Sequence, residues 1–356
     1  MHSPYSDLPK RAFWRSGVTD RPALEPGDLY NPKFNITRDM RIATAGSCFA
    51  QHVGRTLRNA GFNVLDTEPF PSTADDLTAQ KFGYRLYSAR YGNIYTTRQL
   101  MQMFEEMKGQ FKPACPVWEK GGRYYDAMRP SVEPQGLDSE EQVLEHRKRH
   151  LTNVRKAFFN SDLVVFTFGL TEAWVHTESG TVYPTAPGTI AGTFDPSQFQ
   201  FKNYRHHEVL ADFLKFRKLM MKRNPEIKFM ITTSPVPLTA TASGQHVEVA
   251  TSYSKSVLRA VCGELYEEFD NVEYFPSYEI ITSANNRGVY FESNKRNVSM
   301  EGVAKAMSLF LNAHDSEGGA QNQPASSGSA PRKRQNAPKQ ELDNVCEDAL
   351  LESFSK

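Results

Sequence analysis

The sequence has few cysteines and no long apolar run, and each absence excludes a class of protein. Its four cysteines, in 356 residues, lie far apart with no Cys-x-x-Cys pair, which excludes a zinc knuckle or a dithiol redox site. No stretch approaches the roughly 20 apolar residues of a membrane span, and residues 1–20 lack the apolar core of a signal peptide. We therefore expect reduced thiols in a soluble cytoplasmic protein that does not associate with membranes.

Excess charge of one sign is also missing. Lys and Arg number 42 against 41 Asp and Glu, so no global field attracts nucleic acid, and we expect no nucleic-acid partner. No Gly-x-Gly-x-x-Gly or Gly-x-x-x-x-Gly-Lys fingerprint is present, so no nucleotide cofactor is expected. His206-His207-Glu208 superficially suggests a metal site, but adjacent residues on a helix point apart and no third ligand is suitably spaced. We therefore expect no metal.

The chain does contain enough apolar residues, 39%, for a sizeable core. Residues 41–45 read as a short buried strand, Gly46-Ser47 as a tight turn, residues 49–60 as a helix and residues 61–65 as a second strand. Such a β-turn-α-β unit predicts a parallel sheet whose functional groups lie at the carboxyl ends of its strands.

Further elements alternate in the same way and predict a doubly wound α/β domain over residues 40–313. We expect helices at 97–107, 139–159, 206–222, 247–269 and 300–311, and strands at 163–168, 228–232 and 272–274. Two Gly/Pro-bearing excursions, residues 113–135 and 175–200, interrupt this pattern, the second beginning with a hairpin around Ser179-Gly180. Their aromatic residues would either stack on a sugar or acyl group or pack the excursions onto the domain.

The two ends of the chain differ from this domain. Residues 1–39 are rich in Pro, Tyr and Trp and suit an irregular arm lying over the core. Residues 314–356 read as a disordered tail, since Ser, Gly, Gln and Pro cannot bury enough apolar surface. Within it, residues 342–354 either form a short amphipathic helix that docks on a protein partner or are a frayed terminus.

The motif that carries chemistry is Gly46-Ser47-Cys48, where a strand passes through a turn into a helix. This geometry holds a nucleophile above the sheet edge, in front of helix amides that lower a thiol pKa and stabilise an oxyanion. His52 follows Cys48 by four residues, so the two share a face if the helix begins at or just before Cys48. In the alternative interpretation Ser47 caps the helix and Cys48 is a small buried hydrophobe.

These motifs resemble those of the GSCFA family, whose name is spelled by Gly46-Ser47-Cys48-Phe49-Ala50. That family is similar to the SGNH/GDSL hydrolases, which are flavodoxin-like α/β/α enzymes that cleave or transfer acyl groups with a Ser-Asp-His set. The resemblance therefore implies this fold and, more weakly, this reaction. Four further motifs carry it: residues 91–96 (YGNIYT), 168–174 (FGLTEAW), 234–238 (SPVPL) and 274–279 (YFPSYE).

The resemblance implies roles for particular residues. Cys48 takes the nucleophile position, or Ser47 if the register slips by one. Gly92 would offer a backbone N–H to the oxyanion hole, with Asn93 as a nearby amide donor. Gly169-Leu170-Thr171-Glu172 stands where the hydrolases have Gly-x-Asn-Asp, so Thr171 would replace the oxyanion-hole Asn and Glu172 the acid that follows it; alternatively, Thr171 is a helix cap.

The largest departure from the hydrolases lies before the last helix. Their Asp-x-x-His pair corresponds here to Asn294 and Asn297, and an amide has no useful basicity near neutral pH. The candidate bases are then His52 and His246, which are local to the turn and to the loop after residue 237, with His176 a weaker candidate. We expect the remaining internal histidines, in charged helical stretches, to be solvated: His146, His150, His206 and His207. His2 and His314 are read as terminal.

Two functions remain open. The first is an acyl hydrolase or acyltransferase acting on acyl esters, preferably of carbohydrate, with Cys48 or Ser47 as nucleophile; an acyl-CoA donor enters only for a transferase. The second is a non-catalytic SGNH-like module that binds a glycan or a protein, as the loss at Asn294 and Asn297 would allow.

Overall fold

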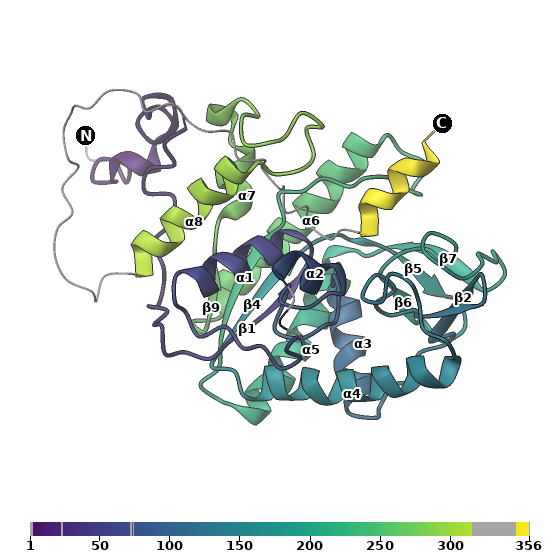
Figure 1. The fold of residues 1–356 in the computed structure, drawn as a ribbon. Coiled ribbons are helices and arrows are strands. Elements are labelled where there is room, and N and C mark those ends of the chain that lie inside the picture. Colours follow the sequence, from purple (N-terminus) through teal and green to yellow (C-terminus); the bar gives the residue numbers. More distant parts are fainter. Residues whose placement is uncertain (1–2, 23, 72, 74, 315–346, 356) are drawn as a thin grey trace, which may run out of the picture.

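A central parallel sheet with helices on both faces forms the middle of the molecule (Figure 1). The computed structural model describes residues 3–22, 24–71, 73, 75–314 and 347–355. The α-helices of these residues are α1 (Phe49–Asn59), α2 (Asp76–Lys81), α3 (Thr97–Met107), α4 (Glu140–Phe159), α5 (His206–Arg223), α6 (Val247–Glu268), α7 (Ser277–Thr282) and α8 (Met300–His314). Six of the α-helices lie close to the predicted residues, because each of them has an apolar face, whereas the short helices α2 and α7 were not predicted.

The strand order of the sheet is that of a doubly wound fold. Its strands, all parallel, are β1 (Ile42–Gly46), β4 (Leu163–Phe168), β8 (Lys228–Thr233) and β9 (Val272–Tyr274), in the order β1-β4-β8-β9. The expected strand at residues 61–65 is reduced to one parallel bridge between Val64 and Ile42. With that segment outside β1, the chain order across the sheet is 2-1-3-4-5, which confirms the flavodoxin-like α/β/α architecture. The order reverses between β1 and β4.

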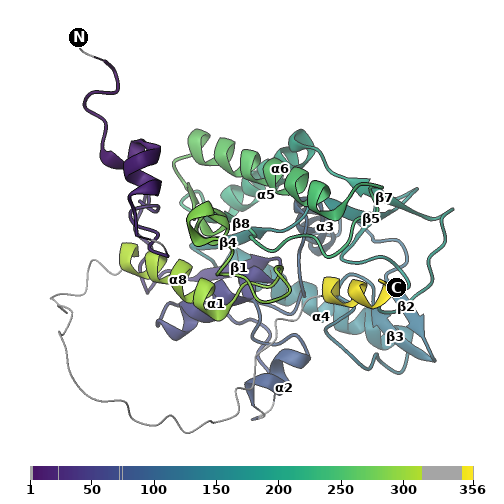
Figure 2. The ribbon, with the colours of Figure 1, turned by 90° about the horizontal axis from the view of Figure 1, so that it is seen from above.

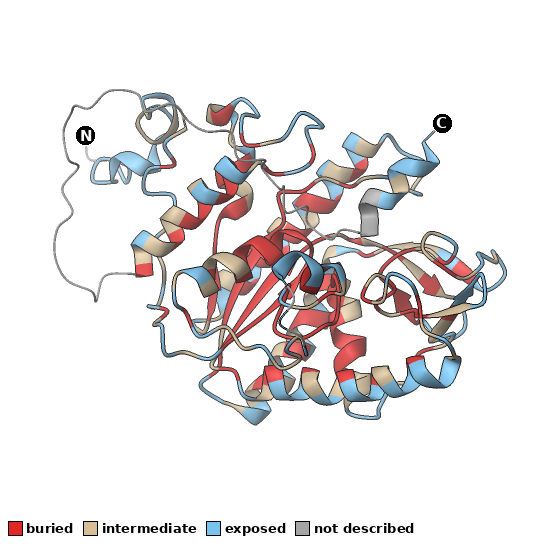
Figure 3. Ribbon diagram, viewed as in Figure 1, coloured by how far each residue is buried: buried red, intermediate tan, exposed pale blue. Residues whose placement is uncertain are grey.

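Two apolar layers cover the two faces of the sheet. Side chains alternate along β1 and β4: Ala43, Ala45, Val164 and Phe166 belong to one buried cluster, while Ile42 and Val165 belong to the other. The first cluster packs against α3, α4, α5 and α6, and the second against α1, α7 and α8. Figure 2 shows α1 and α8 on one side of the sheet with α5 and α6 on the other, and Figure 3 shows the strands buried.

The two excursions form small sheets of their own and pack together. Residues 113–135, expected without strands, contain the hairpin of β2 (Val117–Lys120) and β3 (Arg123–Asp126). The expected hairpin around Ser179-Gly180 is confirmed as β5 (Glu172–His176) and β6 (Val182–Tyr183), with β7 (Phe199–Asn203) on the other edge of β5. Trp118 stacks on Tyr183 with ring centroids 5.4 Å apart, so these aromatics join one excursion to the other.

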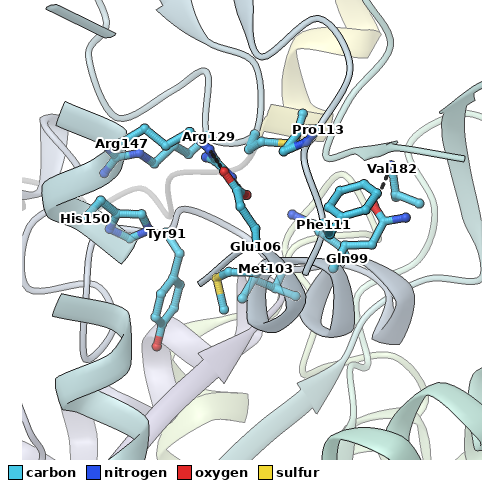
Figure 4. Close-up of a pocket in the computed structure, with 13 residues that line it drawn as sticks. Tyr91, Gln99, Met103, Glu106, Phe111, Pro113, Arg129, Arg147, His150 and Val182 are labelled. Atoms are coloured by element: carbon cyan, nitrogen blue, oxygen red, sulfur yellow. Dashed lines mark hydrogen bonds and ion pairs between the residues drawn. The ribbon is translucent and has the colours of Figure 1, made fainter. Parts of the chain in front are cut away.

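A pocket beside α3 and α4 is lined by three charged side chains and a histidine: Glu106, Arg129, Arg147 and His150 (Figure 4). Arg147 of α4 bonds to Asp126 at 3.0 Å and to Glu106, and Arg129 bonds to Asp126 at 2.7 Å. Burial alone would raise the pKa of Asp126, but the two guanidinium groups outweigh it and hold that pKa below its ordinary value. The expectation that His150 is solvated is wrong: it is buried, and its Nδ1 lies 2.7 Å from the Glu68 carboxylate. The periodicity of charged residues on α4 hid this inner face.

The N-terminal arm lies against the second apolar layer. It includes a short 3-10 helix, η1 (Lys10–Ala12), and a π-helical turn, η2 (Arg15–Thr19). Tyr30 packs edge-on against Phe275, with centroids 5.1 Å apart, and its hydroxyl lies 3.0 Å from His314 Nε2. His314 was read as terminal, but it is the buried last residue of α8, because the arm covers it.

The end of the chain is described only from residue 347 onward. There the 3-10 helix η4 (Glu347–Phe354) occupies the position of the expected short C-terminal helix. The predicted disorder of residues 315–346 falls outside the described residues. None of the helices in the described ranges is long and apolar enough to cross a membrane.

Candidate active site

The Gly46-Ser47-Cys48 turn lies at the point where the strand order reverses. Gly46 pairs with Thr167 of β4, and the Ser47 N–H donates to the Thr167 carbonyl at 3.3 Å. A Cβ on Gly46 would lie 2.5 Å from that carbonyl oxygen, and the residue has φ +133°, so only glycine fits. In doubly wound sheets ligands bind outside the carboxyl ends of the strands at this reversal. The turn is therefore placed where the fold class puts a ligand.

Ser47 is buried against Gly169, the residue that follows β4. A Cβ on Gly169 would lie 2.8 Å from the Ser47 Cβ and 3.0 Å from the Tyr95 carbonyl oxygen, so the missing side chain lets the two loops meet. The interpretation of Ser47 as a helix cap is wrong, because Cys48 occupies the cap position and no side chain caps α1. Within the described residues the Ser47 hydroxyl oxygen has no hydrogen-bond partner. A buried hydroxyl in that state is costly and unusual.

Cys48 and His52 are one helical turn apart. Cys48 has helical dihedrals, φ −52° and ψ −31°, so the helical geometry extends back to it and both side chains lie on one face of α1. Both are buried, with exposed fractions of 5%. Burial, assisted by the nearby Arg55, lowers the pKa of His52 to about 4. His52 is therefore neutral at pH 7 and a weaker base than a solvent-exposed imidazole.

A network of polar side chains supports the turn from below. The single proton of the Tyr87 hydroxyl is shared between the Ser47 carbonyl, at 3.1 Å, and the Asn93 amide oxygen, which also accepts a bond from Gln51 Nε2. The Ile94 N–H donates to the Gly46 carbonyl at 2.9 Å. The expected oxyanion residues of this segment thus adjoin the turn, where Asn93 braces it and Gly92 is a buried glycine with φ +68°. Tyr87 and Gln51 carried no recognisable signal in the sequence.

Thr171 follows Gly169 by two residues, in the segment that connects β4 to β5. The alternative that it caps a helix is wrong, because strand β5 begins at the next residue. Thr171 is fully buried, its N–H donates to Ser254 Oγ at 3.1 Å, and its hydroxyl oxygen has no partner within the described residues. The neighbouring buried Lys255 donates to the Gly169 carbonyl at 2.8 Å. Sequence reasoning missed Ser254 and Lys255, since their spacing in α6 is that of any helix face.

A cavity of about 210 Å³ opens next to this segment. Leu170 and Glu172, which flank the buried Thr171, line one side of it, and the loop after β8 lines the other. The Thr241 hydroxyl donates to Glu172 Oε1 at 2.8 Å, and burial raises the pKa of the Glu172 carboxyl. Trp174, Tyr183 and Phe201 also line the cavity, and Tyr183 in addition stacks on Trp118, which joins the two excursions.

In the loop before α8, the side chain that points inward belongs neither to Asn294 nor to Asn297. Asn294 and Asn297 are exposed, whereas Arg296 between them is buried, with an exposed fraction of 9%. The Asn294 side-chain oxygen accepts the N–H groups of Arg296 and Asn297, at 3.0 and 2.9 Å. The two asparagines thus shape the loop locally.

The other candidate histidines are engaged elsewhere. His246 is exposed at the start of α6, where its Nδ1 accepts the Glu248 N–H at 3.2 Å. His176 lies at the β5–β6 hairpin and accepts the Ser179 N–H at 3.3 Å. Of the candidate bases, His52 alone stands on the helix that begins at the turn. Within the described ranges no three His, Cys, Asp or Glu side chains gather in a way that could hold a metal ion.

Comparison with known proteins agrees with these motifs. The model of the GSCFA family matches residues 41–310, from the first sheet strand into the last helix. The chain belongs to the GSCFA family. Among curated proteins no relative was found. One similar solved structure is a GDSL-like lipase from Bacteroides thetaiotaomicron, 13% identical, with a TM-score of 0.28 over 51% of this chain and 74% of the lipase.

Acid should destabilise this GSCFA protein through its buried histidines. Burial lowers the pKa of His52 to about 4, as it does for His150 with help from Arg129. Each imidazole gains a proton near pH 6.5 when the chain is unfolded but only near 4 when folded, so stability falls as pH drops through this window. From these values each histidine should remove about 2 kcal/mol between pH 7.5 and pH 5.

Urea unfolding at several pH values checks this expectation. In His52→Gln and His150→Gln the loss of unfolding free energy between pH 7.5 and pH 5 should each be smaller than in the wild type by about 2 kcal/mol. Only the change in unfolding free energy with pH is compared, so any pH-independent effect of the substitution on stability cancels. Parallel curves for wild type and variants would contradict the prediction.

Proposed function

We propose that this protein is an acyl-ester hydrolase or acyltransferase whose nucleophile is Cys48, in the Gly46-Ser47-Cys48 turn. Carbohydrate esters are the substrate class that we favour, by analogy with related hydrolases, and the proposed location is the cytoplasm. The proposal rests on family membership, on the doubly wound fold and above all on the polar groups gathered at the strand-order reversal.

The observation that carries the proposal is a pair of buried hydroxyls. Ser47 Oγ and Thr171 Oγ1 lack hydrogen-bond partners within the described residues, and Gly169, two residues before Thr171, packs against Ser47. Two such groups at one site would be costly if they served only the fold. A substrate carbonyl whose oxygen becomes negative during reaction would satisfy such donors.

The proposed reaction has two steps. In the first, the Cys48 sulfur attacks the acyl carbonyl carbon, His52 takes the thiol proton, and the bond from carbon to the alcohol oxygen breaks as the alcohol receives that proton. In the second, water or an acceptor hydroxyl attacks the thioester, losing its proton through His52 to the departing sulfur. The Thr171 hydroxyl and the amides at the start of α1 would stabilise the oxyanion.

An acyl-enzyme experiment tests this function. The protein is incubated with p-nitrophenyl acetate, p-nitrophenyl butyrate, a peracetylated sugar and acetyl-CoA, and turnover and intact mass are followed. We expect turnover of at least one donor and a mass increase of one acyl group. If the folded protein gives neither, but binds glycans equally well with Ser47 or Cys48 replaced by alanine, it is a non-catalytic binding module, as the absence of a titratable residue at Asn294 and Asn297 would permit.

A further inference from the structure

The cavity beside Glu172 contacts a part of the chain that lies far away in sequence. Leu351, in the C-terminal helix η4, is one of its lining residues, together with Leu170, Trp174 and Leu238. Figures 1 and 2 both show η4 (yellow) beside the β5–β7 region and well away from α8, the helix that precedes it in the chain. The segment has therefore crossed the molecule to reach the carboxyl edge of the sheet.

Neighbouring residues of η4 have different surroundings. Leu351 is half-buried at the cavity, whereas Leu350 is 48% exposed and Phe354 62% exposed. Leu351 thus forms part of the cavity wall, while its apolar neighbour Leu350 faces water. This difference indicates a specific contact between one side chain and the cavity, rather than a general collapse of an apolar segment onto the surface.

We propose that η4 is a tethered competitor, which places Leu351 where the apolar part of a substrate would bind. As a statement about substrate, this inference rests on the proposed function, to which it adds the assignment of the substrate's apolar part to this cavity. The chemistry agrees: apolar and aromatic side chains line most of the cavity, so a leucine side chain and a short acyl chain would bury comparable surface there.

Because η4 is covalently attached to the rest of the chain, it needs a weaker contact with the cavity than a free ligand would. Thirty-two residues separate His314 from Glu347, a length that can span roughly 100 Å when extended. An attached segment of this kind acts at an effective concentration of about a millimolar. At that concentration half of the cavities are covered when the contact contributes about 4 kcal/mol, of which Leu351 supplies a part and the rest of η4 the remainder, and such a contact still yields to a substrate at moderate concentration.

Two matched variants of the full chain test the proposal. Leu351→Asp places a charge in the apolar cavity, whereas Leu350→Asp places it one residue away in water. Hydrogen–deuterium exchange measured by mass spectrometry should show faster exchange of residues 170–174 and 237–243 in Leu351→Asp and wild-type exchange in Leu350→Asp. With p-nitrophenyl butyrate, Leu351→Asp should lower KM by roughly three- to tenfold, because η4 no longer covers one side of the cavity.

The two readouts separate the outcomes. Unchanged exchange in Leu351→Asp would overturn the docking of η4, and equal changes in both variants would overturn its specificity for Leu351. Faster exchange without any detectable turnover by the wild type or either variant would leave the docking intact and count against the proposed function. Faster exchange with an unchanged or higher KM would overturn the competition. An effect that disappears on dilution of the protein would assign the seated helix to a second copy.

Discussion

Replacing Cys48 with alanine should lower kcat/KM for the best ester donor by about 10³-fold or more, since the nucleophile of a two-step acyl transfer is lost. The residual rate would come from substrate binding and the oxyanion donors alone. Cys115→Ala is the matched control, because Cys115 is an exposed free thiol on the β2–β3 excursion rather than in the turn. That variant should retain wild-type activity.

The chemistry of the trapped acyl group distinguishes the two possible nucleophiles. A thioester at Cys48 should be cleaved by neutral hydroxylamine, whereas an oxygen ester at Ser47 should resist it under the same conditions. Ser47→Ala should lower the rate less than Cys48→Ala. The reverse order, with a hydroxylamine-resistant adduct, would transfer the role of nucleophile to Ser47, and retained activity in both variants would refute a nucleophile in this turn.

The second large effect concerns the stability of the turn itself. Gly46→Ala combines a strained left-handed φ with a Cβ 2.5 Å from the Thr167 carbonyl oxygen, an atom of the neighbouring strand that cannot move aside. The backbone strain and the overpacking each cost about 1–3 kcal/mol, so we expect a loss of about 3–5 kcal/mol of unfolding free energy. This is a large fraction of the roughly 5–15 kcal/mol that stabilises an ordinary domain.

Gly61→Ala provides the control for Gly46→Ala. Gly61 also has a positive φ, +82°, but a Cβ there meets nothing within 4 Å. Its substitution should cost only about 1 kcal/mol for the dihedral preference. Urea denaturation of both variants isolates the clash as their difference, and a Gly46→Ala variant as stable as Gly61→Ala would show that β1 and β4 can separate without cost. If Gly46→Ala does not accumulate in folded form, Gly46→Ser as an equally strained variant should fail likewise, while Gly61→Ala folds.

The sequence was sufficient to predict the elements that depend on local periodicity. Strands β4 and β9 and helix α3 lie at the expected residues, because apolar spacing and turn residues specify them without reference to the rest of the chain. The predicted strand at residues 61–65 is reduced to a single bridge between Val64 and Ile42. The β2–β3 hairpin was missed because its strands are short and its stability comes from packing against Tyr183 and Phe199.

Several properties of the candidate site depend on contacts between distant segments. Helical spacing alone predicted that Cys48 and His52 could share a face, and that spacing is present. The spacing did not reveal that His52 is buried, and so neutral at pH 7, nor that Arg296 rather than Asn297 turns inward. Burial is set by which surfaces meet, and a local pattern carries no information about it.

By itself, then, the sequence determined the fold class, the strand-turn-helix motif and the residues that could react, because these follow from backbone propensity and spacing over a few residues. The tertiary structure decided which distant segments meet: Ser47 packs against Gly169, Lys255 donates to the Gly169 carbonyl, and Leu351 lines the cavity beside Glu172. Each of these pairs joins segments more than 80 residues apart. Such contacts form only when the whole sheet and both helical layers assemble, because hydrophobic burial is a property of the complete core.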